Sequence, residues 1–298
     1  MKILVTGANG QVGFELRRTL APLGVAGKLI ALDHAQCDLA QPGAVRRVLA
    51  EHAPDVVVNA AAYTAVDKAQ DQRGLAMAVN GTAPGILGGE AAHRGTLVIH
   101  YSTDYVFDGQ LTRPYVETDA TRPQSVYGES KRAGEQALLD SGARCLILRT
   151  SWVYGAHGGN FAKTILRLAG EREALNVVAD QFGAPTAAMR IAAVTTALID
   201  LYRQQGPNGF RYGLYHLAAA GATNWHEYAQ TVVRTAYNGG KVLKLRPERI
   251  RPIPTWDYPL PAPRPANSRL DTTKLSSVFG IHLPDWRDDL QQVLKEMG

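Results

Sequence analysis

Short apolar, β-branched runs alternate with longer amphipathic stretches in the first half of the chain. The apolar runs predict five strands, at residues 2–6, 28–33, 55–59, 96–102 and 144–150. The stretches between them predict helices at residues 11–22, 43–52, 74–93 and 127–140. Apolar strands that alternate with helices are typical of a parallel sheet that is covered on both faces. The pattern therefore predicts an α/β fold with a Rossmann-type, doubly wound parallel sheet.

The pattern loosens after residue 150. It predicts helices near residues 160–170, 190–204 and 225–237 and a strand near residues 176–178. We expect a dinucleotide-binding domain over residues 1–150 and a smaller, mainly substrate-binding α/β domain over residues 151–298. The helix near residues 190–204 could belong to the second domain by sequence order. The alternative is that it packs on the sheet of the first domain.

Residues 251–265 contain six prolines. Proline has no backbone N–H to donate, so this segment cannot form a regular helix or a central strand. We expect an ordered loop or a linker there.

The composition is that of an ordinary globular protein, with 45% hydrophobic and 20% charged residues in 298. No apolar run approaches the length of a membrane span, and glycines interrupt the start of the chain too early for a signal peptide. We therefore expect a cytoplasmic protein without a membrane partner. Cys37 and Cys145 lack metal-ligand spacing, which favours two packed thiols.

The net charge of +5 is modest, and acids and bases are interspersed through most of the chain. We therefore expect no nucleic-acid partner. Residues 241–251 are the exception, because five basic residues face one acid. A solvated surface is one interpretation, and attraction of a phosphorylated small molecule is the other.

Three glycines, Gly7, Gly10 and Gly13, follow the first predicted strand and open the first predicted helix. In this context Gly7 allows a tight turn, Gly10 allows the backbone to approach a phosphate, and Gly13 allows close packing of helix on strand. The helix N-terminus offers N–H groups and a positive dipole end to a pyrophosphate. The spacing predicts a dinucleotide site, and an ordinary glycine-rich turn is the alternative.

Asp33 ends the second predicted strand, twenty residues after Gly13. A carboxylate at this position accepts hydrogen bonds from the adenine ribose hydroxyls and repels a 2′-phosphate. Asp33 therefore favours NADH over NADPH.

Tyr127 and Lys131 lie four residues apart in a predicted helix, so both side chains share one face. A nearby cation favours phenolate over phenol, which predicts a tyrosine of lowered pKa that exchanges protons with a substrate. An exposed helix pair is the alternative. Thr103 follows the fourth predicted strand, where its hydroxyl could polarise a substrate carbonyl.

Six segments carry a closer resemblance: GQVG at residues 10–13, NAAAYTAVD at 59–67, HYSTDYVF at 100–107, RTSWVY at 149–154, DQFGAPT at 180–186 and RPANSRL at 264–270. Together they resemble the dTDP-4-dehydrorhamnose reductase family of the extended short-chain dehydrogenase/reductase superfamily. That family reduces the 4-keto group of dTDP-4-dehydro-L-rhamnose with NADPH or NADH, in the last step of making dTDP-L-rhamnose for surface polysaccharides.

The resemblance also implies roles for individual residues. Tyr127 is the expected proton donor, Lys131 its electrostatic partner and ribose anchor, and Thr103 the residue that tunes the site to its substrate. The expected cofactor-binding residues, besides Tyr127 and Lys131, are Gly7, Gly10, Gln11, Val12, Gly13, Asp33, Asp38, Leu39, Ala61, Ala62, Tyr63 and Thr64. The expected contacts of the dTDP-sugar are Thr103, Asp104, Tyr105, Trp152, Arg264 and Arg269.

Some members of that family are dimers bridged by magnesium through acidic side chains. Glu15 is present here, but Met189 stands where we align a second ligand. The sequence therefore leaves a bridging magnesium open and predicts either a monomer or a homodimer. Two other functions also stay open: a nucleotide-sugar epimerase of the same superfamily, and a non-catalytic dinucleotide-binding regulatory subunit like that of methionine adenosyltransferase.

Overall fold

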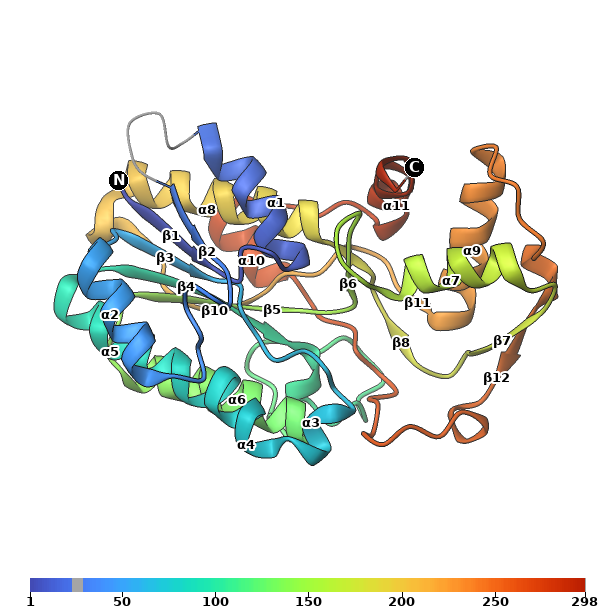
Figure 1. Cartoon of the computed structure of the whole chain (residues 1–298), viewed down its shortest axis with the longest axis horizontal. Coiled ribbons are helices and arrows are strands. Elements are labelled where there is room, and N and C mark those ends of the chain that lie inside the picture. Colours follow the sequence, from blue (N-terminus) through green and yellow to red (C-terminus); the bar gives the residue numbers. More distant parts are fainter. Residues whose placement is uncertain (23–28, 298) are drawn as a thin grey trace.

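A parallel sheet of six strands lies at the centre of the larger half of the molecule (Figure 1). The computed structural model describes residues 1–22 and 29–297. The strand order is β10-β5-β4-β3-β1-β2. The strands are β1 (Ile3–Thr6), β2 (Leu29–Leu32), β3 (Val56–Asn59), β4 (Leu97–Thr103), β5 (Cys145–Thr150) and β10 (Gly213–His216). The chain leaves β1 toward β2 and returns on the other side as β3, so the strand order switches beside β1.

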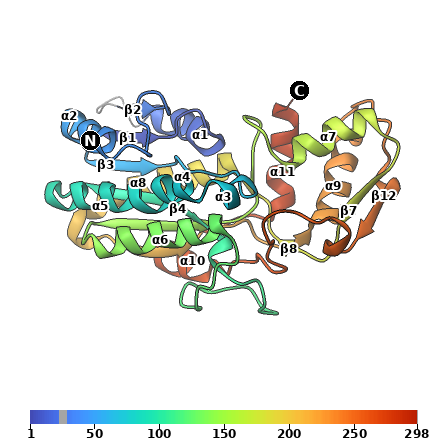
Figure 2. The ribbon, with the colours of Figure 1, turned by 60° about the horizontal axis from the view of Figure 1, so that its bottom comes forward.

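Helices cover both faces of this sheet (Figures 1 and 2). One face packs against α1 (Gln11–Leu20), α8 (Ala188–Gly209) and α10 (Thr273–Phe279), and the other against α2 (Pro42–His52), α5 (Ala83–Arg94) and α6 (Val126–Asp140). Within β1, Ile3 and Val5 point into the first layer and Leu4 into the second. Strands that are buried on both faces are apolar along most of their length. The predicted doubly wound α/β fold is confirmed.

A second hydrophobic core lies beyond the carboxyl ends of the strands (Figure 1). It is built around Trp286, which is fully buried. Its elements are α7 (Phe161–Glu171), α9 (Trp225–Asn238), α11 (Trp286–Glu296), β7 (Leu175–Val178) and β12 (Ile250–Ile253). Two further small sheets pair β6 (Val153–Tyr154) with β9 (Thr186–Ala187) and β8 (Phe182–Gly183) with β11 (Thr223–Asn224).

The observed strands of the first half lie close to the predicted ones. The second differs most: β2 ends at Leu32, one residue before Asp33. The predicted start at Lys28 lies outside the described residues.

The helix predicted over residues 74–93 is confirmed as a helical run without a break, but its middle is not a regular α-helix. The run consists of α4 (Arg73–Ala76), the π-helix η2 (Met77–Thr82) and then α5. Pro84 has no N–H to donate to the carbonyl of Asn80, four residues earlier, and its ring would clash there in a regular α-helix. The wider π turn accommodates this proline.

The prediction that residues 251–265 lie in a loop is wrong for the start of the segment. Residues Ile250–Ile253 form β12, which pairs in parallel with β7. A two-stranded sheet leaves one edge of each strand unpaired, and an edge strand tolerates Pro252 because its missing N–H can face outward. The rest of the segment is the 3₁₀ turn η5 (Thr255–Asp257) followed by an extended stretch.

The sequence pattern also missed the sixth strand, β10, which has four residues and begins with Gly213. Together with α8 it joins the first hydrophobic core, although both follow residue 150. The division of the chain into domains at residue 150 stays a prediction. Among the helices of residues 1–22 and 29–297, none combines the length and the apolar character needed to cross a membrane.

A buried ion pair links α6 to β5. The guanidinium of Arg149 donates to both carboxylate oxygens of Glu135, at 2.7 Å each. The two side chains are 3% and 0% exposed. An ion pair of this kind contributes little in itself, but either charge alone in this place would be strongly unfavourable.

We expect Glu135→Gln to lower the free energy of unfolding by about 3 kcal/mol, because it leaves the buried guanidinium of Arg149 uncompensated. Urea denaturation followed by circular dichroism measures the change. Glu171→Gln is the control, since the Arg167–Glu171 pair is exposed (61% and 53%) and such pairs contribute about 0–1 kcal/mol. Equal losses in the two variants would contradict the interpretation.

Candidate active site

The carboxyl ends of the central strands open into a cavity of about 710 Å³. This is the edge at which doubly wound sheets bind ligands, next to the switch in strand order. Most of the residues predicted from the sequence line it: Gly7, Gly10, Gln11, Val12, Asp33, Asp38, Leu39, Ala61, Ala62, Thr64, Thr103, Asp104, Tyr105, Tyr127, Lys131 and Trp152.

The glycine-rich turn at one end of the cavity is shaped by close contacts. Gly7 adopts a φ of +68°, which side-chain-bearing residues rarely take. A Cβ atom on Gly13 would lie 2.0 Å from the carbonyl oxygen of Gly7. Gly10 caps α1 without a side-chain hydrogen bond, so the first N–H groups of the helix stay available to a ligand. These features fit the pyrophosphate of a dinucleotide.

Asp33 lines the same cavity just beyond β2. Its carboxylate accepts hydrogen bonds from the Asn9 side chain at 3.2 Å and from the Gln36 backbone at 3.1 Å. The carboxylate is therefore oriented before any ligand binds, as recognition of a ribose requires.

A loop after β6 packs over the glycine-rich turn, and the sequence did not reveal it. The ring of His157 stacks on Phe14 with 4.3 Å between centroids and lies 3.0 Å from the carbonyl oxygen of Asn9. Asn160 donates to the side-chain oxygen of Gln11 at 2.9 Å. Gly158 and Gly159 from this loop line the cavity. Two adjacent glycines before a helix were the only signal in the sequence.

Lys131 lies in the lining of the cavity and is buried, with 2% exposure. Its Nζ donates to the carbonyl oxygen of Tyr101 at 2.5 Å and lies 3.4 Å from Nε2 of His100. Burial lowers the pKa of Lys131 to about 8, against the weaker opposite effect of Glu135. The residue is thus a cation at neutral pH that loses its proton in mildly alkaline solution.

Tyr127 departs from the prediction in its ionisation. Ser125 caps α6 and sets the helix so that the ring of Tyr127 meets Tyr105 edge to face, with 5.5 Å between centroids. The predicted lowering of its pKa by Lys131 is wrong for the protein alone. Burial raises the pKa of Tyr127 to about 12, and a hydrogen bond with Thr103 opposes this only in part. The ammonium of Lys131 points to a backbone carbonyl instead of the phenol.

Thr103 and Asp104 complete this group at the end of β4. The hydroxyl of Thr103 donates to the Asp104 carboxylate at 3.1 Å and accepts from the backbone of Tyr105 at 3.2 Å. Burial raises the pKa of Asp104 to about 6, and hydrogen bonds with Ser268 and Thr103 limit the rise. Three polar side chains thus converge within a largely apolar pocket.

Trp152 forms a wall of the cavity in a strained conformation, with a φ of +48°. Its ring stacks on Trp225 with 3.5 Å between centroids. A Cβ atom on Gly183 would lie 2.6 Å from the ring, so only glycine leaves it room. Trp225, which sequence reasoning missed, is held by a 3.1 Å hydrogen bond from its Nε1 to Gln181.

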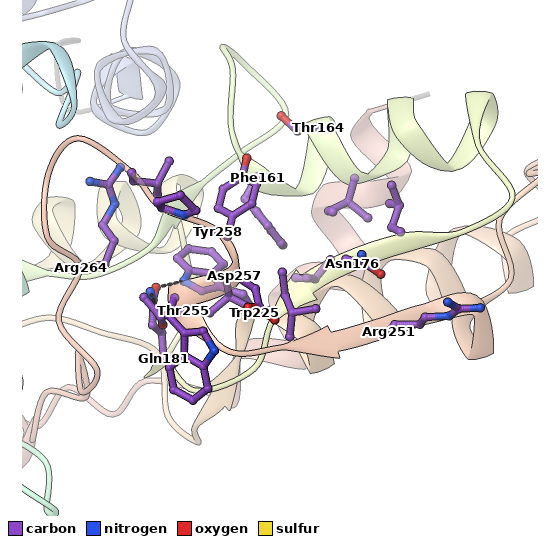
Figure 3. Close-up of a pocket in the computed structure, with 18 of the residues that line it drawn as sticks. Phe161, Thr164, Asn176, Gln181, Trp225, Arg251, Thr255, Asp257, Tyr258 and Arg264 are labelled. Atoms are coloured by element: carbon purple, nitrogen blue, oxygen red, sulfur yellow. Dashed lines mark hydrogen bonds between the residues drawn. The ribbon is translucent and has the colours of Figure 1, made fainter.

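A second cavity, of about 1100 Å³, adjoins the first (Figure 3). Tyr105 and Trp225 line both. Its walls come from α7, β7, β12 and the chain that follows β12. Arg251 and Arg264 lie at opposite ends, with the rings of Phe161, Trp225 and Tyr258 between them (Figure 3).

Four predicted residues lie elsewhere than the first cavity. Arg264 lines the second cavity and forms a two-point ion pair with Asp67. Arg269 lines neither, because its guanidinium is bonded to Asn267 and to the Thr112 carbonyl. Tyr63 donates its hydroxyl proton to Gln72, and Gly13 packs behind the glycine-rich turn.

Both residues considered for magnesium make contacts within the chain. Glu15 is buried and accepts a hydrogen bond from Arg18 at 3.2 Å. Met189 packs against the second hydrophobic core. No group of three or more His, Cys, Asp or Glu side chains within residues 1–22 and 29–297 is placed to hold a metal ion.

Comparisons with known proteins agree with this geometry. A family model described as RmlD substrate binding domain matches residues 1–298. The dTDP-4-dehydrorhamnose reductase of Burkholderia thailandensis is 50% identical over 288 residues, which cover 96% of each chain.

Solved structures show the same similarity over nearly the full length. A dTDP-4-dehydrorhamnose reductase from Clostridium acetobutylicum has a TM-score of 0.89 at 35% identity and covers 99% of each chain. The reductase from Bacillus anthracis, solved in complex with NADP, has a TM-score of 0.89 at 32% identity with the same coverage.

We expect Gly13→Ala to weaken dinucleotide binding about tenfold or more, because the added methyl group would displace the turn at Gly7. Titration with NADPH followed by fluorescence measures the affinity, and circular dichroism verifies the fold. Gly74→Ala is the control, because a Cβ atom there meets nothing within 4 Å. Unchanged affinity in Gly13→Ala would exclude this turn as the phosphate cradle.

Proposed function

This chain belongs to the RmlD substrate binding domain family, and on that basis we propose that it reduces the 4-keto group of dTDP-4-dehydro-L-rhamnose with NAD(P)H. The product is dTDP-L-rhamnose, an activated sugar for surface polysaccharides. The relatives of 46–50% identity are dTDP-4-dehydrorhamnose reductases. The protein is thus an NAD(P)H-dependent oxidoreductase.

One observation carries the proposal. The side chains of Tyr127 and Thr103 both line the dinucleotide-shaped cavity beside Tyr105, which also lines the second cavity. A ketone that enters this junction from the second cavity can be reached by both hydroxyls. A dinucleotide held by the glycine-rich turn and Asp33 would provide the hydride for such a reduction.

Tyr127 acts as the acid in the reaction. Its pKa of about 12 keeps the phenol protonated at neutral pH, which is the form that a proton donor to the C4 oxygen must have. In the protein alone the Thr103 hydroxyl gives its one proton to the Asp104 carboxylate at 3.1 Å. In this proposal that proton turns toward the same substrate oxygen as negative charge develops on it.

Lys131 stabilises the tyrosinate that remains after proton transfer. The ammonium lies one helical turn beneath Tyr127, and the carbonyl of Tyr101 holds it there. It also binds the ribose of the dinucleotide in this proposal. The positive charge on Lys131 is present below its pKa of about 8, so the tyrosinate is stabilised near neutral pH.

The second cavity suits the dTDP half of the substrate. Its aromatic side chains, Phe161, Trp225, Trp256 and Tyr258, offer flat apolar faces to a base or a sugar. Arg172 and Arg251 bring positive charge to the same walls, as a diphosphate requires. Arg251 comes from the basic run 241–251, which gives weight to the phosphate interpretation of that run. Trp152 and Tyr105 would contact the sugar, whereas Arg269 has no support from its position.

Both dinucleotides are candidates for the cofactor. The Bacillus anthracis reductase binds NADP, whereas Asp33 here favours the ribose hydroxyls of NADH. Magnesium is not part of the proposal. The cytoplasmic location, the lack of nucleic-acid and membrane partners, and the choice of monomer or homodimer stay predictions.

Turnover of dTDP-4-dehydro-L-rhamnose with NADH and NADPH side by side tests the proposal, with absorbance at 340 nm as the measurement. We expect net consumption of the dinucleotide in proportion to the sugar reduced. A tightly bound dinucleotide that is recycled without net consumption would instead indicate the epimerase. Tight dinucleotide binding without turnover would indicate the regulatory subunit.

We expect Tyr127→Phe to lower kcat by about 10²- to 10⁴-fold, since the donated proton is lost, while the Kd for the dinucleotide stays unchanged. Steady-state kinetics and fluorescence titration measure the two effects. Tyr237→Phe is the control, because that side chain is 45% exposed and lines neither cavity. Near-normal turnover in Tyr127→Phe would remove the phenol from the mechanism.

We expect Asp33→Ala to shift the preference from NADH toward NADPH, because the carboxylate that repels a 2′-phosphate is gone. The ratio of kcat/KM for the two dinucleotides measures the shift. An unchanged ratio would mean that other residues choose the cofactor.

A further inference from the structure

A proline-rich strap, residues 254–265, forms one wall of the second cavity. It runs from the end of β12 back toward the loop after β3 (Figure 1). Nine of its residues line the cavity: Thr255, Trp256, Asp257, Tyr258, Pro259, Leu260, Ala262, Pro263 and Arg264. The position of the strap therefore sets the shape of this cavity.

The strap is held by polar contacts near its two ends. At one end Thr255 donates its hydroxyl proton to Asp180 at 2.6 Å, and its backbone N–H donates to the same carboxylate at 3.0 Å. Between the ends, residues 256–261 make no hydrogen bond to other segments of the described chain. The aromatic side chains there are exposed, Trp256 by 78% and Tyr258 by 56%.

The other anchor is an ion pair to the cofactor side of the molecule. The guanidinium of Arg264 donates to both carboxylate oxygens of Asp67, at 2.9 and 2.8 Å. The backbone N–H of Ala262 donates to the same carboxylate at 3.2 Å. Asp67 follows Val66, which lines the first cavity, so the pair joins the loop after β3 to the strap.

This pair has the geometry of a specific contact. Two-point pairing fixes both the distance and the orientation of a guanidinium. The side chains are 16% and 37% exposed, so solvent screens the pair only in part. Hydrogen bonding to Arg264 also lowers the pKa of Asp67, which keeps the carboxylate charged at neutral pH.

We propose that the Asp67–Arg264 pair is a latch that holds the strap over the second cavity and thereby sets the affinity for the dTDP half of the substrate. The statement about dTDP rests on the proposed function. Arg264 is then a positioning residue that acts through the strap. Without the latch, the strap keeps the contacts of Thr255 with Asp180 and Gln181 at one end and the pairing of Ala266 with Phe182 just past the other end. Ligand binding then has to order the loosened part between them. The prolines keep the loss of affinity moderate, because they also restrict the conformations of the strap when it is not held.

The test uses the full-length protein with Asp67→Asn, Arg264→Gln and the double variant. Chymotrypsin cleavage after Trp256 reports whether the strap is held, and calorimetry with dTDP as the probe reports affinity. We expect each single variant to be cleaved several-fold faster and to bind dTDP about tenfold more weakly, equivalent to 1.4 kcal/mol. The double variant should be no worse than either single one, because both changes remove the same contact.

Kinetics separate positioning from chemistry. We expect KM for the sugar nucleotide to rise with the dTDP Kd, while kcat changes by less than about threefold, because Tyr127, Thr103 and Lys131 are untouched. Arg113→Gln is the matched control: Arg113 also forms a two-point pair, with Asp119 at 2.8 Å for both contacts, and lines neither cavity. It should change neither cleavage nor affinity.

Unchanged cleavage in the single variants, or additive losses in the double variant, would overturn the latch. Faster cleavage together with wild-type protein that does not bind dTDP would support the latch and refute the proposed substrate. The two hypotheses thus fail in different ways.

Discussion

Complete burial of the parallel sheet is the constraint on which the rest of the structure depends. All positions of β1, β3, β4 and β5 are buried, so those strands carry mostly apolar side chains and gain stability from both helical layers. Chemistry is then confined to the edge where the strands end. Thr103 ends β4, the glycine-rich turn follows β1, and Ala61 and Ala62 follow β3. The site therefore forms at the carboxyl ends of the strands, where the chain is no longer buried on both faces.

The parts of the fold that local pattern determines could be predicted from the sequence, and those that depend on distant contacts could not. The strands of the first half and the glycine-rich turn have local signals, namely apolar runs and glycine spacing. Strand β10 exists because β5 offers it an edge, and Trp225 reaches the site because Trp152 stacks on it. The hydrophobic periodicity of a sequence gives no information about such contacts between distant residues. The proline rule failed at Pro252 because it excludes central strands and says little about a strand with a free edge.

Electrostatics of the site follow from desolvation more than from the Tyr-x-x-x-Lys spacing. Burial disfavours any charged form, so it raises the pKa of Tyr127 to about 12 and lowers that of Lys131 to about 8. At a pH below the Lys131 pKa of about 8, the phenol of Tyr127 is therefore neutral and the amine of Lys131 is protonated. Sequence spacing places the two groups on one helical face, but it cannot show that Tyr101 takes the ammonium as hydrogen-bond partner. The pair is therefore poised as a protonated acid above a cation, which suits reduction.

A chain of contacts connects Trp152, in the wall of the first cavity, to the strap. Trp152 is held in its unusual backbone conformation against Trp225, whose Nε1 donates to the side-chain oxygen of Gln181 at 3.1 Å. The amide nitrogen of Gln181 donates in turn to the hydroxyl of Thr255, also at 3.1 Å. One glutamine thus connects the wall that would face the sugar to one anchor of the strap, and the other anchor reaches the cofactor loop through Asp67. Because one short strap depends on both halves of the molecule, the shape of the second cavity depends on how those halves are positioned.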